Sequence, residues 1–330
     1  MMRHFLDITD LTAGELEQVL QLSRAPISAL GCPLRGAGAA LIFEKPSNRT
    51  RQSMEMAVVQ LGGHPVYTRG EEVGFDTRET VEDVTRIMAG YHAVLAARVF
   101  DHTVVQRMAA VSDVPVVNML SDHSHPLQAL ADTLTMVAEF GDLRGRTIAY
   151  VGDFNNVARS LAEACVMLGA HVRFGCPHGY DASDDDLVRI DGLGDGTVTW
   201  TPDPFQAVAG ADAVHTDTWT SMGQEMEKAE RMEVFGHYQV NDGLMAAAAP
   251  GAIFMHCLPA YRGLEVAAEV IDGPRSRVFA QGHNRMHAAR GLLAFLLAQR
   301  TEPARTEPTR TEPARTDPAR TDPQPMDTAR

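Results

Sequence analysis

Short apolar runs of strand length alternate with helical stretches along most of this chain. The apolar runs lie at residues 39–43, 64–68, 93–97, 114–119, 147–151, 171–176, 197–202, 211–216 and 252–257. A strand, a helix and a further strand in succession build parallel strand pairs with the helix packed on one face of the sheet. The alternation therefore predicts an α/β fold with doubly wound parallel sheets.

The alternation breaks once, at Gly141-Asp142-Leu143-Arg144-Gly145-Arg146, and restarts at Thr147. We therefore expect two domains, over residues 1–143 and 144–284, with a hinge and an active site between them. A last apolar-faced helix is predicted over residues 285–300, with Arg285 just before its apolar pattern begins at Met286, and should pack back on the first domain.

Residues 301–330 repeat a Thr-Glu-Pro-Ala-Arg unit that drifts to Thr-Asp-Pro. Regular proline, mixed charge and few apolar residues predict a disordered tail. Its removal should leave any activity of the chain unchanged.

Composition restricts the classes of partner. A net charge of −14 over 330 residues argues against nucleic acid or an anionic membrane as the general partner. No apolar run approaches the ~18 residues of a membrane span, and the N-terminus does not resemble a signal peptide, so we expect a cytoplasmic protein. The four cysteines show neither disulfide nor metal-ligand spacing, so no metal site is predicted.

The stretch Glu44–Arg51 carries the strongest functional signal because it joins a predicted strand to a predicted helix. Such a turn directs free backbone N–H groups and the positive end of the helix dipole toward one point. Two hydroxyls, the Asn48 amide and the guanidiniums of Arg49 and Arg51 belong to the same stretch. The pattern predicts an anion site, for phosphate, against the simpler alternative that Ser47 only caps the helix.

Other polar groups also follow predicted strands, where open parallel sheets bind their ligands. They are Arg98, His125 with Gln128, Asn156, Asp217 with Ser221-Met222-Gly223, and His256-Cys257-Leu258-Pro259. Each has a simpler alternative on its own: a turn histidine for His125, a core thiol for Cys257 and a helix cap for Asp217. The Gly152 turn has Phe154 where a dinucleotide motif needs its second glycine, so we expect no nicotinamide cofactor.

These motifs, in this order, resemble the signature set of the aspartate/ornithine carbamoyltransferases over roughly residues 3–299. The motifs are Ser47-Asn48-Arg49-Thr50-Arg51, His125-Pro126-Leu127-Gln128, Asp217 with Ser221-Met222-Gly223, and His256-Cys257-Leu258-Pro259. The Ser-Met-Gly and His-Cys-Leu-Pro elements are similar to the ornithine branch. The resemblance implies an N-terminal carbamoyl phosphate domain, a C-terminal ornithine domain, a homotrimer or a multiple of trimers, and no metal or organic cofactor.

The resemblance also implies roles for individual residues. Carbamoyl phosphate would be bound by Ser47, Asn48, Arg49, Thr50, Arg98, His125, Gln128, Cys257, Leu258 and Arg285. The α-amino and α-carboxylate groups of ornithine would be held by Asn156, Asp217, Ser221 and Met222. Arg98, His125, Asp217 and Cys257 would take part in the chemistry, with Cys257 or Asp217 assisting loss of the proton from the attacking amine.

Several features depart from the family pattern, among them three single residues. Asn48 stands where threonine is usual, Leu127 where cysteine is usual, and Tyr261 where histidine is usual. Carbamoyl transfer to ornithine, giving citrulline and phosphate, is the leading interpretation. The alternatives are transfer to putrescine or a shorter diamino acid, and a catalytically silent paralogue that binds carbamoyl phosphate.

Overall fold

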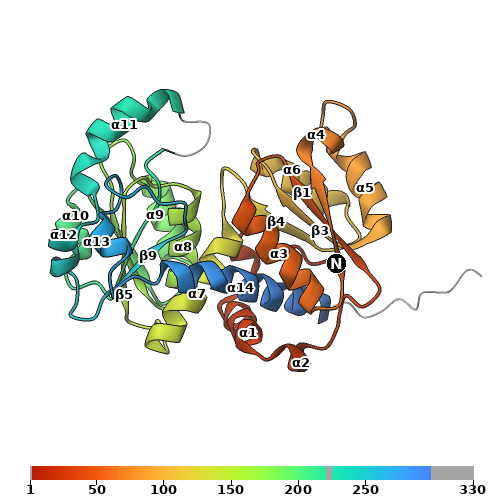
Figure 1. Ribbon diagram of the computed structural model, residues 1–330, viewed down its shortest axis with the longest axis horizontal. Helices are drawn as coiled ribbons and strands as arrows, with labels where there is room; N and C mark the ends of the chain where they lie inside the picture. The colour runs from red at the N-terminus through yellow and green to blue at the C-terminus, as the bar shows by residue number, and fades with distance from the viewer. Residues whose placement is uncertain (1, 221–224, 299–330) are drawn as a thin grey trace, which may run out of the picture. The chain divides into compact units, whose positions relative to one another are not determined.

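The computed structural model describes residues 2–220 and 225–298, and contains two fully parallel sheets (Figure 1). The first has the order β2-β1-β3-β4 and the second the order β7-β6-β5-β8-β9. The strands are β1 Gly38–Phe43, β2 His64–Arg69, β3 His92–Arg98, β4 Val116–Leu120, β5 Thr147–Val151, β6 His171–Gly175, β7 Thr197–Thr201, β8 Ala213–Thr216 and β9 Ile253–His256. The predicted α/β class with two doubly wound parallel sheets is confirmed.

Helices connect the strands. They are α1 Ala13–Arg24, α2 Ile27–Leu30, α3 Asn48–Gln60, α4 Gly70–Val73, α5 Val81–Tyr91, α6 His102–Val111, α7 Pro126–Phe140, α8 Asn156–Met167, α9 Asp184–Asp191, α10 Pro204–Val208, α11 Lys228–Phe235, α12 Asp242–Ala247, α13 Ala268–Ile271 and α14 Val278–Ala298, with 3-10 turns η1 Ile8–Asp10, η2 Glu225–Glu227 and η3 Gly236–Tyr238. No helix in these described ranges is both long and apolar enough to cross a membrane.

The strand order explains why polar motifs collect at particular turns. Strand order reverses between β1 and β3 in the first sheet and between β5 and β8 in the second. A crevice opens at such a switch point, beyond the carboxyl ends of the strands. The motifs that follow these four strands are therefore brought to two crevices.

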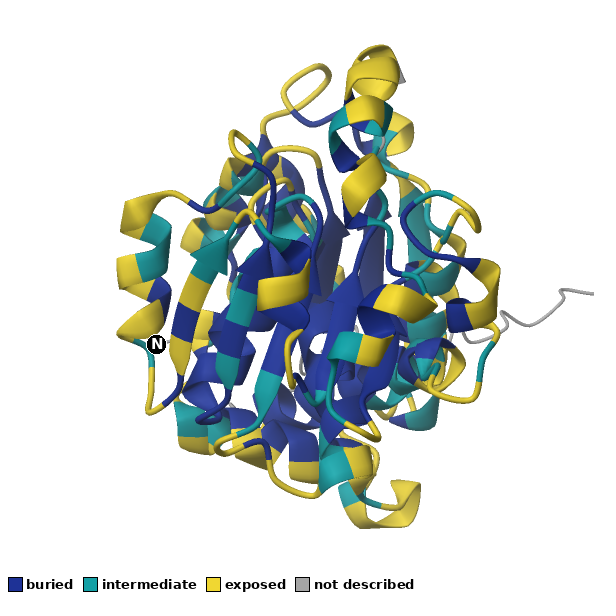
Figure 2. Ribbon diagram, turned by 90° about the vertical axis from the view of Figure 1, so that its left-hand side faces the viewer, coloured by how far each residue is buried: buried dark blue, intermediate teal, exposed yellow. Residues whose placement is uncertain are grey.

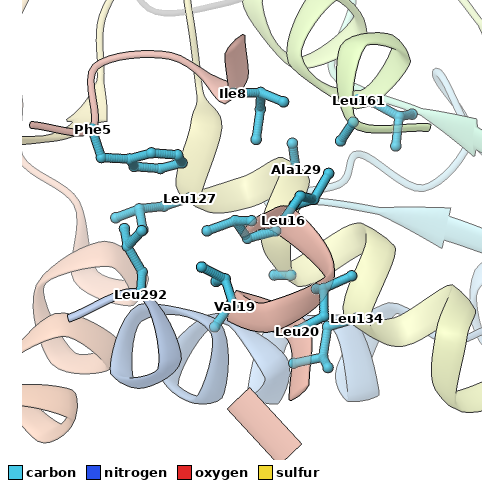
Figure 3. Close-up of a cluster of buried hydrophobic side chains, with 14 of the residues drawn as sticks. Phe5, Ile8, Leu16, Val19, Leu20, Leu127, Ala129, Leu134, Leu161 and Leu292 are labelled. Atoms are coloured by element: carbon cyan, nitrogen blue, oxygen red, sulfur yellow. The ribbon is translucent and has the colours of Figure 1, made fainter. Parts of the chain in front are cut away.

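The core fills the space between sheets and helices. The central strands are buried, whereas exposed residues gather on the outer helix faces and loops (Figure 2). One buried cluster joins η1, α1, α7, α8 and α14, with labelled side chains including Phe5, Leu16, Leu127 and Leu292 (Figure 3).

Helix α14 packs against α1, α3 and α7, as expected for the last helix (Figure 1). It begins at Val278, however, so Arg285 lies inside the helix and not before it. The prediction started too late because inward-facing residues of the first turns include the polar Gln281 and Arg285, both buried. Apolar periodicity does not mark polar residues that face a site.

Two short helices lie in segments with weak sequence patterns. The Gly- and acid-rich segment over residues 69–78 contains α4, and Val73 and Phe75 are buried there. Within residues 264–271, the helix is limited to α13. The predicted tail, residues 301–330, lies outside the described residues, as do Ser221 and Met222.

Candidate active site

A cavity of about 750 Å³ lies at the carboxyl ends of both sheets. Its lining combines the β1–α3 turn, the end of β3, the turns after β4, β5, β8 and β9, and one residue of α14. The candidate residues in this lining are Ser47, Asn48, Arg49, Thr50, Arg98, His125, Asn156, Asp217, Cys257, Leu258 and Arg285. Motifs far apart in the sequence thus share one space.

The β1–α3 turn forms one end of the cavity. Ser47 caps α3, since its Oγ accepts a 3.4 Å hydrogen bond from the Thr50 backbone N–H. Ser47 and Asn48 line the cavity as well, so capping and lining are both observed. The side-chain Oδ1 of Asn48 accepts from Gln52 Nε2 at 2.5 Å, which directs part of its amide along the helix.

Arg51 does not take part in this end of the cavity, contrary to the prediction that both arginines of the motif point to the anion. Its Nε lies 2.8 Å from Glu55 Oε1, and its guanidinium stacks 3.8 Å from the centre of the Tyr67 ring. One guanidinium of the motif, that of Arg49, lines the cavity.

Arg98 and Arg285 add two buried guanidiniums. Thr50 Oγ1 accepts from Arg285 Nη2 at 2.5 Å and from Arg98 Nη1 at 3.5 Å. Burial, followed by like charge from Arg285, lowers the pKa of Arg98 to about 10, and burial also lowers the pKa of Arg285 to about 10. Within residues 2–220 and 225–298, neither guanidinium has a carboxylate within 4.0 Å.

A buried cation carries a large desolvation cost unless an anion lies close enough to neutralise its charge. Both guanidiniums remain charged at pH 7, and the α3 N-terminus adds partial positive charge. This end of the cavity therefore suits a small dianion such as a phosphate group.

His125 is the N-terminal cap residue of α7 and is 5% exposed. Its backbone N–H donates to Ser160 Oγ at 3.1 Å, which fixes the position of the residue. Burial first, then the charges of Arg285 and Arg98, holds the pKa of His125 well below its ordinary value. The imidazole is therefore neutral at pH 7, and its buried Nδ1 has no partner among the described residues.

Gln128 and Leu127 lie on the same helix but do not line the cavity. Gln128 is 1% exposed, and its Oε1 accepts from Arg285 Nη1 at 2.5 Å. Leu127 belongs to the hydrophobic core (Figure 3). The substitution of leucine at this position therefore changes packing and not the cavity lining.

Asp217, Asn155 and Cys257 line a second end of the cavity. Asp217 Oδ2 accepts from Asn155 Nδ2 at 3.0 Å, and its Oδ1 accepts from Cys257 Sγ at 3.1 Å. Burial, followed by the Asp217 charge, raises the pKa of Cys257 well above its ordinary value. Cys257 is therefore a neutral thiol that donates to Asp217, and it cannot accept a proton from an amine. No described helix begins at Asp217, so the helix-cap alternative fails.

Asn156 and Leu258 complete the predicted lining. Asn156 Nδ2 donates to the Ser121 backbone oxygen at 2.6 Å. Leu258 has a φ of +58°, unusual for a residue other than glycine, and it is partly exposed to the cavity.

Sequence reasoning missed several lining residues. Asn155 caps α8 and also donates to Asp217, and only its position before a predicted helix could have drawn attention to it. Asp153 and Arg231 form a largely buried ion pair with a 2.7 Å contact between Oδ2 and Nη1. Arg231 comes from α11, about 80 residues further along the chain, so no local pattern connects the two.

Asp217, His256 and Cys257 bring potential metal ligands within 4.8 Å of one another. Both ring nitrogens of His256 are already engaged, because Nδ1 accepts from the Leu258 N–H at 2.9 Å and Nε2 lies 3.3 Å from Glu265 Oε1. A metal ion that used His256 here would have to displace one of these contacts.

Comparison with known proteins accounts for this arrangement. The sequence model described as aspartate/ornithine carbamoyltransferase, carbamoyl-P binding domain, matches residues 3–138, and the model of the Asp/Orn binding domain of the same family matches residues 144–296. The chain belongs to the aspartate/ornithine carbamoyltransferase family.

Individual relatives agree with the family assignment. The chain is 44% identical over 308 residues to an ornithine carbamoyltransferase of Parafrankia, a match that covers 91% of this chain and 97% of the relative. An ornithine carbamoyltransferase of Thermus thermophilus is 44% identical over 297 residues, covering 89% of this chain and 97% of the relative. The solved ornithine carbamoyltransferase of Pyrococcus furiosus superposes with a TM-score of 0.86 at 40% identity and covers 90% of this chain and 97% of that chain.

Asn48 and Tyr261, which also depart from the family pattern, are exposed, in contrast to the buried Leu127. Asn48 is exposed at the mouth of the anion end, and Tyr261 is an exposed aromatic residue that lines the cavity. Tyr261 is held through its backbone, since its N–H donates to Glu265 Oε1 at 2.5 Å. Of the three departures, therefore, Asn48 and Tyr261 are the ones that a ligand can reach.

Proposed function

We propose that the protein transfers the carbamoyl group of carbamoyl phosphate to the δ-amino group of L-ornithine, giving L-citrulline and phosphate. The observation that carries this proposal is a cavity with two unlike ends. Buried guanidiniums and a helix N-terminus form one end, and the Asp217 carboxylate, with donors from Asn155 and Cys257, forms the other. Family membership fits this division of the cavity.

The phosphate of carbamoyl phosphate binds at the first end. Its oxygens accept from the α3 N-terminus and from Ser47, Asn48, Arg49 and Thr50, with further charge from Arg98 and Arg285. Both arginines are buried, so their charge is little screened by solvent. The same groups stabilise inorganic phosphate as it leaves.

The carbonyl oxygen develops negative charge when an amine attacks the carbonyl carbon. Arg98, Thr50 and the neutral imidazole of His125 are the donors that we assign to this oxygen. Gln128, which does not line the cavity, acts through Arg285, because its Oε1 accepts from the Arg285 guanidinium. The C–O bond to phosphate then breaks, phosphate departs with the electron pair, and it takes up the second proton that the attacking nitrogen loses.

Ornithine binds at the second end of the cavity. Asn156, Asp217, Ser221 and Met222 hold its α-amino and α-carboxylate groups, as the family resemblance implies. The δ-amine has a pKa of about 10 and must lose a proton before it attacks. We assign uptake of this proton to Asp217, because the Cys257 thiol already carries its own proton. Cys257 and Leu258 then lie beside the reacting groups.

The experiment is a test of amine acceptors. Purified protein is incubated with carbamoyl phosphate and, separately, L-ornithine, putrescine, 2,4-diaminobutyrate or aspartate, and the ureido product is measured. We expect kcat/KM for ornithine to exceed that of every other amine by at least about 100-fold. Faster turnover of another amine would move the function within the family. Phosphate binding without any turnover would favour the silent paralogue.

The biological setting is part of the same proposal. We place the reaction in arginine metabolism, in the cytoplasm, and in a homotrimer or a multiple of trimers, with no nucleic acid or membrane partner. The net charge of −14 supports the absence of an anionic partner. Light scattering that gave a monomer mass would contradict the proposed assembly.

A further inference from the structure

A row of buried polar side chains lies behind the anion end of the cavity. Asp132, one turn after Gln128 on α7, is 0% exposed. Its Oδ1 accepts from Gln128 Nε2 at 2.7 Å and from Gln281 Nε2 at 2.6 Å. Asp132 does not line the cavity, so it cannot touch a bound substrate directly.

The contacts of Gln128 connect Asp132 to the cavity. A carboxamide has an accepting end and a donating end, whereas a carboxylate offers acceptors only. Because Nε2 of Gln128 is bound by Asp132, its Oε1 must face the other way, where it accepts from Arg285 Nη1. The reversed amide would place two sets of buried donors against each other, which is costly.

We propose that Asp132 is a positioning residue for anion binding. It fixes the orientation of the Gln128 carboxamide, and the correctly oriented Oε1 holds the Arg285 guanidinium at the cavity wall. Thr50 supplies the second acceptor for the same guanidinium. The kinetic part of this inference rests on the proposed carbamoyl transfer, whereas the part on phosphate affinity does not.

Asp132 has a second set of contacts, through Gln281, which could give it a purely structural role. Gln281 also binds Asp132, and its Oε1 accepts from the backbone N–H of His256 at 2.9 Å at the end of β9. Gln281 Nε2 also lies 3.1 Å from His215 Nε2 on β8. Asp132 could therefore act only as a structural tie between α7, α14 and the second sheet.

Double-mutant cycles distinguish an effect of Asp132 through Gln128 from an effect through Gln281. The near-isosteric change Asp132→Asn introduces an NH2 group that can favour the reversed Gln128 amide. It is made in the wild-type, Gln128→Met and Gln281→Met backgrounds, and the Kd of inorganic phosphate is measured by calorimetry. We expect D132N to raise this Kd about tenfold in the wild-type and Q281M backgrounds, and less than about twofold in Q128M.

The matched control is Thr133→Val, on the next residue of α7. Thr133 is also fully buried, but its hydroxyl donates to the Ala129 and Leu130 backbone oxygens of its own helix. T133V should leave the phosphate Kd within about twofold of wild type. Circular dichroism verifies that each variant is folded at the assay temperature, and Asp132→Ser replaces D132N if the latter does not fold.

An unchanged phosphate Kd in D132N, or the same increase in the wild-type and Q128M backgrounds, would overturn the inference. If D132N no longer raised the phosphate Kd in the Q281M background, Asp132 would act through its structural contact with Gln281, and the inference would also be overturned. If the wild type binds phosphate but transfers no carbamoyl group, the proposed function fails and the cycle still tests Asp132. If turnover is found, kcat/KM for carbamoyl phosphate should follow the same pattern.

Discussion

At the scale of single residues, the cavity combines two buried guanidiniums, a neutral imidazole and a neutral thiol. The low pKa of His125 follows from burial beside Arg98 and Arg285. The high pKa of Cys257 follows from burial beside Asp217. These protonation states assign His125 and Cys257 as hydrogen-bond donors, and they leave Asp217 as the acceptor at the end of the cavity where we propose that ornithine binds.

The first prediction separates Asp217 from Cys257. Asp217→Asn should lower kcat/KM for ornithine by about 100-fold or more, because the substitution removes the buried carboxylate that we propose interacts with the amine of the substrate. Cys257→Ser keeps a hydrogen-bond donor toward Asp217 and should lower kcat/KM for ornithine less than about tenfold. Steady-state kinetics measures both, and an equal loss in the two variants would contradict the assigned roles.

The second prediction concerns Asn155, which has two functions. Asn155→Asp keeps a good helix cap, so any loss of stability should come from the new contact with Asp217 and not from the cap. The new carboxylate faces Asp217 where an N–H donor stood, so the KM for ornithine should rise about tenfold or more.

Asn241 provides the control for this exchange because it caps α12 and does not line the cavity. Asn241→Asp should change neither stability nor kinetics. A KM for ornithine that is unaffected in N155D would show that Asn155 serves only as a cap.

At the scale of elements, close helix contacts bring α14 into the first half of the chain. Gly291 on α14 faces Ser23 on α1, and a Cβ added there would lie 2.2 Å from Ser23 Oγ and 2.6 Å from the Ser23 backbone nitrogen. No side chain larger than hydrogen fits at this crossing. The same helix carries Arg285 to the cavity and Gln281 to the buried carboxylate of Asp132.

The third prediction follows from this crossing. Gly291→Ala should lower the free energy of unfolding by about 1–2 kcal/mol, because overpacking outweighs the gain in helix propensity. Gly282 on the same helix has nothing within 4 Å of its added Cβ, so Gly282→Ala should not destabilise. Chemical denaturation measures both, and equal stabilities would contradict the packing argument.

The fourth prediction concerns the contact between α8 and α9. Glu163 is fully buried, and burial raises its pKa to about 8 although Arg189 Nη1 lies 2.8 Å from its Oε1. The folded state therefore holds this proton more tightly than the unfolded state, in which the pKa is about 4.5. The stabilisation is complete below pH 4.5 and is lost as the pH rises toward 8.

Glu163→Gln removes this titration. The stability difference between wild type and E163Q should therefore shift in favour of E163Q between pH 5 and 8, by at most about 1.4 kcal/mol per pH unit. Urea unfolding at several pH values measures it. A difference that does not vary with pH would mean that Glu163 is ionised throughout.

At the scale of the whole molecule, the sequence predicted the fold class and most of the cavity. Strand-length apolar runs located the nine strands of the described residues within about two residues, because most of these strands are buried, although β2 and β7 are only partly so. Residues at or shortly after strand ends, such as Ser47, Arg98 and Asp217, could be predicted as neighbours because carboxyl ends of parallel strands converge.

The remainder depended on contacts that no local pattern encodes. Asp132 and Gln281 lie inside helices and are buried by long-range packing, and the Asp153–Arg231 pair joins β5–α8 to α11. Arg51 belongs to the anion motif by sequence, but it turns to Glu55 and Tyr67 on the surface. Arg51 points away from the cavity because of its side-chain direction on the first turn of α3, and residue spacing alone does not specify that direction.

The most direct test of the account follows the atoms through the reaction. Carbamoyl phosphate labelled with ¹³C at the carbonyl is mixed with the protein and ornithine labelled with ¹⁵N at the δ position, and the products are examined by NMR. We predict a ¹³C signal coupled directly to ¹⁵N in citrulline, with one phosphate released for each coupled carbon. Release of phosphate with the label in bicarbonate, and no coupled signal, would contradict carbamoyl transfer at this cavity.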